Sequence, residues 1–375
     1  MPLGIPFTLP GISVLLAMIV LPLGAAHAAL PDLEPTFAVR SWDSEDGLPQ
    51  APVNALAQTG EGYLWLGTGA GLARFDGARF QVFQTNQTPA LGDNRITSLL
   101  VDDGGVLWVG TKAGTLARRE GNDFVPVPLD PRLLGVAITA LGPAAGGGLW
   151  LGTSSRGVVR FKNGTCDFSL PSNGLPQARV QQLFRNHEEI PWVGTGLRLM
   201  RFQEGRWRNV PSGGKSGGMA YAAAAEAGDS ILLAGRPEKS GGNWRTRVLR
   251  LGGKQPAEVF SPYVSGPDWG RIGPLGVSED SRGRLWLWTL GEGVYFWAGS
   301  NGWRRLDTPA MPKWTKVSAT LADPDGLIWM ASLDGELFRI SEQLATMIRQ
   351  PAELDQNIVQ TCAVTRDGTL WLGTD

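Results

Sequence analysis

The 375-residue sequence is poor in histidine, cysteine and charge: it has two histidines, two cysteines, 18% charged residues and a formal net charge of −1. This balance argues against nucleic-acid binding, because a polyanion is normally bound by a basic domain or by clustered Lys and Arg. His27 lies in the predicted leader, so His187 is the single histidine of the mature chain. We therefore expect no metal site, no Ser-His-Asp triad, no cofactor and no catalytic residue here.

Long apolar runs are also scarce, and the one that is present is N-terminal. Gly11 to Ala28 is uncharged and apolar, and it ends in Ala26-His27-Ala28, which fits an A-x-A cleavage site. Residues 1–28 are therefore predicted to be a signal peptide that delivers the chain to the periplasm. An uncleaved anchor is the alternative, because the first basic residue is Arg40. No second apolar run of about 18 residues follows, which places the rest of the chain on one side of the membrane.

Glycine and tryptophan are abundant, with 51 and 15 residues, and many of them fall in one recurring segment. It reads YLWLGT up to Thr68 and returns as VLWVGT, GLWLGT, IPWVGT and TLWLGT, with weaker copies RLWLWT and LIWMAS. Successive copies are 42 or 43 residues apart, except across one gap, where Leu232 of SILLAGR stands at the tryptophan position. The series gives eight repeats, and their aligned tryptophans are predicted core residues: Trp65, Trp108, Trp150, Trp192, Trp286, Trp329 and Trp371.

A repeat of about 40 residues that holds several short strands is typical of a β-propeller built from four-stranded blades. In the first repeat, Val53–Gln58 alternates in polarity, YLWLGT is a buried strand, and Gly71–Phe75 and Arg79–Phe83 flank the turn residues Asp76-Gly77. The glycines of GTGAG do not form a nucleotide loop, because Gly71 leads into a strand rather than a helix. The sequence therefore predicts an all-β fold.

Ring closure favours seven blades. Residues 37–42 align with fourth-strand segments such as Phe80 to Thr85, so they can complete the last blade and remove the open sheet edges. We expect a seven-bladed propeller over residues 29–351, followed by an incomplete eighth repeat over 352–375 that begins a second propeller. An eight-bladed ring is the alternative, but repeat eight lacks a third strand.

Acidic residues recur in the turn before the tryptophan strand: Asp102, Asp103, Asp323, Asp325 and Asp367. Such repetition indicates a structural turn rather than one catalytic acid. A propeller glycoside hydrolase, which would use paired carboxylates, is therefore a less favoured alternative. The two cysteines, Cys166 and Cys362, fall in repeats three and eight and are predicted to be free.

Three tryptophans lie outside the repeat register, and charged residues flank them. Aromatic faces beside charged groups can stack on a sugar ring and hydrogen-bond its hydroxyls, so these positions are predicted to bind ligand. Plain packing of loops is the alternative. The predicted residues are Trp244, Arg245, Asp268, Trp269, Arg271, Lys313 and Trp314.

Ser41 to Phe83 combines a DGLP lead-in with LWLGT and GLARFDG, and a second lead-in, NGLPQARVQQL, spans Asn173 to Leu183. These residues resemble the periplasmic regulator-propeller sensors of hybrid two-component systems and related diguanylate cyclases. The resemblance covers nearly the whole mature chain and is weak for repeat five. It implies propellers that respond to oligosaccharides in some relatives, followed by an immunoglobulin-like stalk, a membrane helix and a histidine kinase or diguanylate cyclase.

The resemblance therefore implies a periplasmic ligand-sensing domain without catalytic activity of its own. Its expected partner is an oligosaccharide or another small molecule. Membrane attachment and homodimerisation would occur through downstream parts of a longer receptor, and the sequence indicates no dimer interface. A periplasmic scaffold that binds proteins is the alternative.

Overall fold

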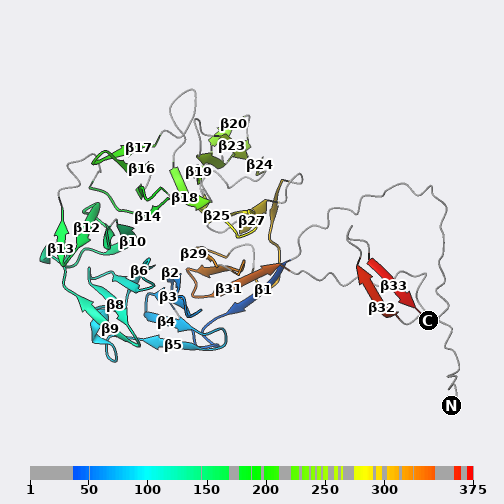
Figure 1. The fold of residues 1–375 in the computed structure, drawn as a ribbon, viewed down its shortest axis with the longest axis horizontal. Coiled ribbons are helices and arrows are strands. Elements are labelled where there is room, and N and C mark those ends of the chain that lie inside the picture. The colour runs from blue at the N-terminus through cyan, green and yellow to red at the C-terminus, as the bar shows by residue number, and fades with distance from the viewer. Residues whose placement is uncertain are drawn as a thin grey trace, which may run out of the picture. The chain divides into compact units, whose positions relative to one another are not determined.

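The structure is a computed structural model of the chain (Figure 1). The chain divides into two compact units, Met1–Glu34 and Pro35–Asp375, and every described residue belongs to the second. The predicted leader lies outside the described residues. In the described part, no helix is both long and apolar enough to cross a membrane. The described residues are 37–49, 51–144, 146–168, 177–186, 188–195, 198–210, 221–227, 230–235, 238–240, 243–245, 248–251, 257–260, 263–264, 274–289, 293–297, 302–311, 315–323, 325–342, 359–364 and 370–374.

Six four-stranded antiparallel blades are each built from one repeat, and the strands of a blade pair in chain order. The first blade is β2 (Val53–Gln58), β3 (Leu64–Thr68), β4 (Gly71–Phe75) and β5 (Phe80–Phe83). The second is β6 (Ile96–Val101), β7 (Leu107–Thr111), β8 (Leu116–Glu120) and β9 (Asp123–Val127). The third is β10 (Ile138–Ala144), β11 (Gly148–Thr153), β12 (Val158–Lys162) and β13 (Thr165–Asp167). Short 3-10 helices, η1 (Pro89–Leu91) and η2 (Pro131–Leu133), precede β6 and β10.

The other three of these blades follow the same plan. The fourth blade is β14 (Gln182–Arg185), β15 (Pro191–Thr195), β16 (Arg198–Gln203) and β17 (Arg206–Asn209). The fifth is β18 (Tyr221–Ala227), β19 (Ser230–Gly235), β22 (Val248–Leu251) and β23 (Ala257–Phe260). The sixth is β25 (Pro274–Glu279), β26 (Leu285–Thr289), β27 (Val294–Trp297) and β28 (Trp303–Arg305).

The remaining four-stranded sheet is composite, since it joins the two ends of the ring. Its strands are β29 (Val317–Ala322), β30 (Ile328–Ser332), β31 (Leu337–Glu342) and β1 (Phe37–Trp42). Strand β1 runs antiparallel to β31, with Phe37 opposite Glu342 and Trp42 opposite Leu337. This pairing is the one expected for residues 37–42, and it gives β31 a partner along its outer edge.

Two smaller sheets complete the described part of the chain. The first consists of β20 (Glu238–Ser240), β21 (Asn243–Arg245) and β24 (Tyr263–Val264). Strands β20 and β21 lie between β19 and β22 in the sequence, so the long fifth repeat uses its extra residues here. The second sheet has two strands, β32 (Val359–Val364) and β33 (Leu370–Thr374).

The structure confirms the all-β propeller class but corrects the predicted blade count. The chain forms six four-stranded blades from single repeats, not seven plus a partial blade. The seventh repeat supplies three strands and takes its fourth from the N-terminal end, and the described residues of the eighth repeat pair as two strands alone. The count of single-repeat blades is six because the seventh repeat is completed by pairing between distant residues, such as Ser341 and Ala38, which are 303 positions apart.

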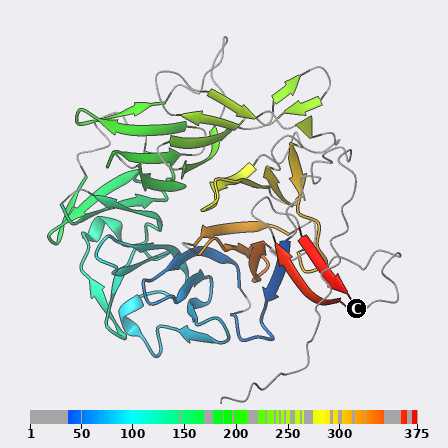
Figure 2. The ribbon, with the colours of Figure 1, turned by 45° about the vertical axis from the view of Figure 1, so that its right-hand side comes forward.

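The first strands of the sheets are neighbours around the ring, in the order β2, β6, β10, β14, β18, β25 and β29, and β29 contacts β2 again. Figure 2 shows the sheets in this order, from blue through green to orange. The hydrophobic core lies between neighbouring sheets. Trp65, with 1% of its surface exposed, packs between the first and second blades against Leu107 and Phe124. Truncating a buried tryptophan of this kind costs about 3–5 kcal/mol.

Strand β1 packs on both of its neighbouring blades, which explains why it belongs in the composite sheet. Phe37 lies 5.1 Å from Trp286 and 4.9 Å from Phe296, measured between ring centroids, in the sixth blade. At the other end of the strand, Trp42 is 2% exposed and lies 5.0 Å from Phe75 in the first blade. Both contacts are edge-on, the geometry that aromatic quadrupoles favour.

Candidate ligand-binding cavity

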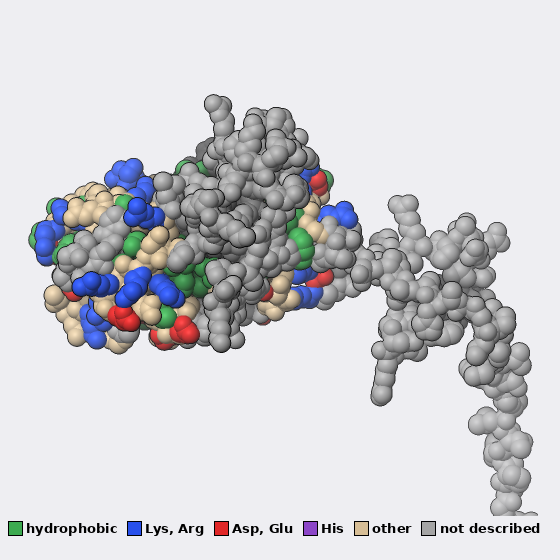
Figure 3. Space-filling view, turned by 90° about the horizontal axis from the view of Figure 1, so that it is seen from above, with side chains coloured by type: hydrophobic (Ala, Val, Ile, Leu, Met, Phe, Trp, Pro, Cys, Tyr) green, Lys and Arg blue, Asp and Glu red, His purple; other side chains and the backbone are tan. Residues whose placement is uncertain are grey.

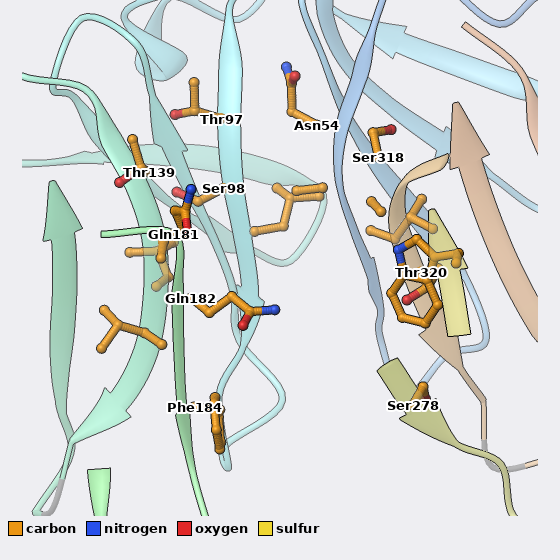
Figure 4. Close-up of a pocket in the computed structure, with 18 of the residues that line it drawn as sticks. Asn54, Thr97, Ser98, Thr139, Gln181, Gln182, Phe184, Ser278, Ser318 and Thr320 are labelled. Carbon is orange, nitrogen blue, oxygen red and sulfur yellow. The ribbon is translucent and has the colours of Figure 1, made fainter. Parts of the chain in front are cut away.

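A cavity of about 430 Å³ lies among the first strands of the blades, on the axis of the ring (Figure 4). This volume falls within the usual range of small-molecule sites. Strands β2, β6, β10, β14, β25 and β29 contribute its described walls, with Trp288 of β26. Its lining residues are Asn54, Ala55, Leu56, Thr97, Ser98, Leu99, Thr139, Ala140, Leu141, Gln181, Gln182, Leu183, Phe184, Val277, Ser278, Trp288, Ser318, Ala319 and Thr320.

A second cavity, of about 470 Å³, continues the first toward the ends where the first strands begin. Arg179 and Leu333 line it and are exposed, so this part reaches the protein surface. Among the described lining residues of the two cavities, Arg179 is the one charged side chain. The two cavities share Asn54, Thr97, Thr139, Gln181, Gln182 and Ser318. The junction between the cavities is therefore uncharged and polar.

Four of these shared residues occupy the same position in their blades. Each follows a fully buried β-branched residue at the start of the first strand, as Asn54 follows Val53. The pairing register shifts at this point, so Val53 and Ala55 have partners in β3 whereas Asn54 has none. The same shift occurs at Thr97, Thr139 and Ser318. A β-bulge of this kind leaves one residue unpaired and re-aims its side chain, here toward the axis.

The four bulge side chains bond to the next blade, and we call them the acceptor arc: Asn54, Thr97, Thr139 and Ser318. Asn54 Nδ2 donates to Ile96 O at 2.8 Å, and Thr97 Oγ1 donates to Ile138 O at 2.6 Å. Thr139 Oγ1 donates to Val180 O at 2.6 Å, and Ser318 Oγ donates to Val53 O at 2.5 Å. Ile96, Ile138 and Val53 each begin the neighbouring first strand, and Val180 lies two residues before β14. The acceptor arc therefore links the composite sheet, through three blades, to the segment that leads into β14.

The fifth and sixth blades break this pattern, and we call them the apolar sector. Their registers shift between Tyr221 and Ala223 and between Pro274 and Gly276, which puts Ala222 and Leu275 at the bulge position. Neither side chain can donate a hydrogen bond. Among the described residues, the bulge side chains that bond the next blade therefore come from the composite sheet and the first three blades, while β25 adds Ser278 to the cavity wall.

Trp288 gives the apolar sector a different cavity wall. It stands where LWLGT has glycine, it is 7% exposed, and it is opposite Gly276 in the sheet. A Cβ atom on Gly276 would lie 1.8 Å from Cζ2 of Trp288, so the indole requires glycine at that position. In Figure 4, Gln182 and Phe184 lie on one side of the cavity, and Ser278 and Thr320 lie on the other. The cavity thus combines amides and hydroxyls with two aromatic rings.

Residues 47–70 and 90–113 match the two component regulator propeller family. These segments are regulator propeller repeats. The predicted resemblance to regulator propellers is confirmed over these two segments. No curated protein sequence matches the chain.

Solved extracellular domains share the fold of this chain. The extracellular domain of a proposed hybrid two component system from B. thetaiotaomicron is 16% identical, with a TM-score of 0.63, and the match covers 90% of this chain and 47% of that one. A second such domain from the same organism is 18% identical, with a TM-score of 0.59, and the match covers 87% and 44%. The chain therefore spans less than half the length of these extracellular domains.

An enzyme also has this fold. A streptogramin B lyase is 14% identical to the regulator propeller, with a TM-score of 0.61, and the match covers 82% of this chain and 98% of the lyase. At this identity the likeness shows the fold alone.

The seven predicted ligand-binding residues are not part of the cavity as described. Trp244 and Arg245 lie in β21, where they pair with Val264 and Tyr263, and their side chains are outside the description. The other five, Asp268, Trp269, Arg271, Lys313 and Trp314, lie outside the described residues, as does His187. In the sequence, Asp268, Trp269 and Arg271 precede β25, and Lys313 and Trp314 precede β29. Val317, the first residue of β29, lines the second cavity. Their role stays a prediction.

Sequence reasoning missed the acceptor arc, although a signal for it is present. The residue after the first-strand valine or isoleucine is polar in repeats one to four and seven: Asn54, Thr97, Thr139, Gln181 and Ser318. Alternation of polarity along a strand predicts one exposed and one buried face. It does not show that a bulge turns one polar residue from each blade toward a shared axis.

The repeated aspartates are structural, as predicted, where the structure describes them. The carboxylate accepts a hydrogen bond from the indole Nε1 of the tryptophan six positions later, and its other oxygen accepts backbone N–H bonds within the turn. The indole bonds are 2.7 Å for Asp102 and Trp108, 3.0 Å for Asp280 and Trp286, and 3.1 Å for Asp323 and Trp329. Asp103 forms an ion pair with Arg185. These bonds occupy the acids, which removes the argument for a glycoside hydrolase at these positions.

Asp280 shows the electrostatics of this turn. Burial alone would raise the pKa of its carboxyl, but hydrogen bonds from the Trp286 indole and from the backbone and guanidinium of Arg284 outweigh burial and lower the pKa. The carboxylate is therefore held ionised as an acceptor, which is the opposite of what a general acid needs.

Charged side chains of both signs are interspersed over the described part of the face in Figure 3. Within the described residues, no group of three or more His, Cys, Asp or Glu could hold a metal ion. Cys166 is free, as predicted, and Cys362 has no described side chain. Burial raises the pKa of the Cys166 thiol, which keeps it protonated at neutral pH.

Proposed function

We propose that this regulator propeller is the ligand-sensing input domain of a periplasmic receptor, and that it binds an uncharged, hydroxyl-bearing ligand of the oligosaccharide type. The observation that carries the proposal is the axial cavity, whose described walls present hydroxyls, amides and two aromatic rings with Arg179 as their one charge. A neutral polar wall suits a neutral polar ligand, because a buried charge without a partner is costly.

The two aromatic rings supply the second half of this chemistry. Sugar rings have apolar C–H faces as well as hydroxyl edges. Trp288 and Phe184 offer flat apolar surfaces, while Gln182 and Thr320 offer hydrogen-bonding groups in the same cavity. Sites of this kind usually combine apolar contact area with a few polar groups that fix orientation.

The receptor context is part of the proposal. The sensor structures that share the fold are extracellular domains, and this chain corresponds to less than half of each. We infer a periplasmic location that depends on the predicted leader, residues 1–28, and a downstream membrane helix with a histidine kinase or diguanylate cyclase. A ligand would act on that output by binding one arrangement of the receptor more tightly than another.

The loop residues predicted from the sequence enter the proposal as a second set of contacts. Replacing Trp244, Trp269 and Trp314 together with alanine should abolish oligosaccharide binding if these aromatic faces hold the sugar. The thermal midpoint is the control, since an unchanged midpoint shows that the fold is intact. Unchanged binding would remove the three tryptophans from the site and leave the axial cavity as its location.

Calorimetric titration of the secreted chain tests the proposal directly. A matched pair of probes is galactotriose, which is neutral, and trigalacturonate, in which carboxylates replace the hydroxymethyl groups. Neutral probes such as galactotriose, cellotriose and chitotriose would be titrated in parallel. We expect at least one neutral glycan to bind and trigalacturonate to bind at least tenfold more weakly than galactotriose. Preferential binding of trigalacturonate, or no binding of any neutral glycan, would contradict the proposal.

A further inference from the structure

The acceptor arc does two things with the same atoms. Each side chain lines the cavity, and each also bonds a carbonyl of the neighbouring blade. The accepting residue is the one that precedes the next member of the arc: Ser318 bonds Val53, which precedes Asn54, and Asn54 bonds Ile96, which precedes Thr97. The bonds therefore form a relay from blade to blade along the cavity wall.

In the relay, the hydroxyl protons of Thr97, Thr139 and Ser318 are donated to backbone carbonyls. A serine or threonine hydroxyl has one proton and two acceptor lone pairs. Thr97 has carbonyls at 2.6 Å and 3.2 Å, and Thr139 has carbonyls at 2.6 Å and 3.3 Å, so their protons are directed to the backbone. What remains for a molecule in the cavity is acceptor capacity. Asn54 uses one of its two amide N–H donors on Ile96 O, and its Oδ1 can accept a hydrogen bond from a ligand.

The hydroxyls of Thr97, Thr139 and Ser318 therefore favour an occupant that donates hydrogen bonds. Carboxylate and phosphate groups have no donor when ionised, so the acceptor arc disfavours them. A cation would satisfy the oxygens, but no carboxylate is among the described lining residues to balance its charge. Neutral hydroxyl groups remain as the donors that fit.

We propose that the acceptor arc is a donor-selective subsite that couples ligand binding to the contacts between blades. The proposal rests on the proposed function and deepens it. A hydroxyl that accepts a bond from a sugar becomes a stronger donor in its own bond, because linked hydrogen bonds polarise one another. Binding of a glycan hydroxyl to Thr97 or Thr139 therefore strengthens the bond to the next blade. Ala222 and Leu275, at the bulge positions of the apolar sector, have no side-chain donor for such a bond, so we expect the stabilisation along the acceptor arc.

Thr97→Val tests the subsite with little damage to the fold. Valine has the shape of threonine without the hydroxyl. Ser98 Oγ also donates to Ile138 O, at 2.8 Å, so that carbonyl keeps a partner after the substitution. We expect galactotriose, or whichever neutral trisaccharide binds the native chain, to bind Thr97→Val about 3–10-fold more weakly, the loss of one hydrogen bond. Thr97→Ser, which keeps the hydroxyl, should retain native affinity.

Thr115→Val is the matched control. Thr115 Oγ1 also donates to a distant backbone carbonyl, Leu91 O, at 2.8 Å, but Thr115 does not line the cavity. It should lower stability without changing the affinity for the trisaccharide. If Thr97→Val fails to fold, the test is the change in amide hydrogen exchange that the trisaccharide causes, measured on the native protein, Thr97→Ser and Thr139→Ser. In the native protein, the trisaccharide should slow exchange more in β6 and β10 than in β19 and β22.

The outcomes separate the two proposals. Native affinity in Thr97→Val, or uniform protection around the ring, overturns the subsite while a binding native chain still supports the sensor function. Failure of the native chain to bind any neutral trisaccharide overturns both. Weaker binding in Thr97→Val, native binding in Thr97→Ser and Thr115→Val, and protection confined to the acceptor arc support the subsite.

Discussion

The acceptor arc and the apolar sector are built from the same repeat, yet they place different side chains at and beside the bulge of the first strand. In the first blade the bulge residue is Asn54, and the pair beside it is Ala55 opposite Gly67. In the sixth blade the bulge residue is Leu275, and the corresponding pair is Gly276 opposite Trp288. The backbone register is the same, but the residue opposite the position after the bulge is Gly67 in the first blade and Trp288 in the sixth. The comparison shows that one backbone plan supports both a hydrogen-bonded wall and an aromatic wall.

The largest expected effect comes from the core beneath each sector. Trp65→Ala removes the buried indole of the first blade and should lower the free energy of unfolding by about 4 kcal/mol. Leu232→Ala removes the corresponding residue of the fifth blade, where leucine replaces tryptophan, and should cost about 3 kcal/mol. Chemical denaturation of both variants measures the difference. A larger loss for Leu232→Ala would mean that the apolar sector contributes more to stability than the tryptophan repeats.

The exchanged pair of the sixth blade can be tested by reversing it. Gly276→Ala places a methyl group into the Trp288 indole and should destabilise by about 3 kcal/mol, the upper range for overpacking. Adding Trp288→Gly restores the pair of the first blade, so the double variant should be more stable than the sum of the two single losses predicts. Thermal unfolding of all four proteins gives the coupling energy. Strict additivity would show that the two positions do not depend on each other.

A pH profile distinguishes the turn acids of the two sectors. The folded-state pKa of Asp280 is lowered, so its contribution to stability is present above the ordinary carboxyl pKa and is lost as the pH falls through the folded value. Asp280→Asn should cost about 2 kcal/mol at neutral pH and should flatten this acid-side loss. Unfolding midpoints between pH 7 and pH 3 provide the measurement, with Asp102→Asn in the second blade as the matched variant. An unchanged acid slope in Asp280→Asn would assign the loss to other groups.

The smallest effect is a gain. Ala222→Thr puts a hydroxyl at the bulge position of β18, the position from which the acceptor arc bonds the next blade elsewhere in the ring. One added hydrogen bond should raise the free energy of unfolding by about 1 kcal/mol. Thermal unfolding should show the rise, and Ala222→Val, which adds the same shape without the donor, should not. Equal effects of the two substitutions would mean that shape, not bonding, governs this position.

Much of the fold was predictable because the repeat carries local information. The tryptophan segments, the Asp-Gly turns and the alternation of Val53–Gln58 each depend on neighbours in the sequence, and the structure places strands at these segments. The tryptophans with described side chains are buried, apart from Trp108, Trp297 and Trp303, which are half-buried. The family followed from the same segments, because residues 47–70 and 90–113 carry its motif.

The candidate site was less predictable, since no single repeat contains it. Trp244, Trp269 and Trp314 are predicted to bind ligand because they depart from the repeat register. Thr97 and Thr139 follow the register, so in the sequence they resemble ordinary strand residues. Their importance comes from the ring, which brings one residue of each blade to a common axis. The repeat pattern itself gives no sign of this convergence.

The sequence by itself determined the blade plan, the turn acids and the kinship with regulator propellers, because strand alternation, turn chemistry and the tryptophan spacing act over a few residues. The sequence also predicted that residues 37–42 close the ring, whereas only the tertiary structure decided the number of single-repeat blades and how the cavity wall bonds. Pairing of Phe37 with Glu342 and of Ser318 with Val53 joins residues at opposite ends of the ring. Such contacts exist only after the ring has closed, because closure brings the first and last repeats within hydrogen-bonding distance.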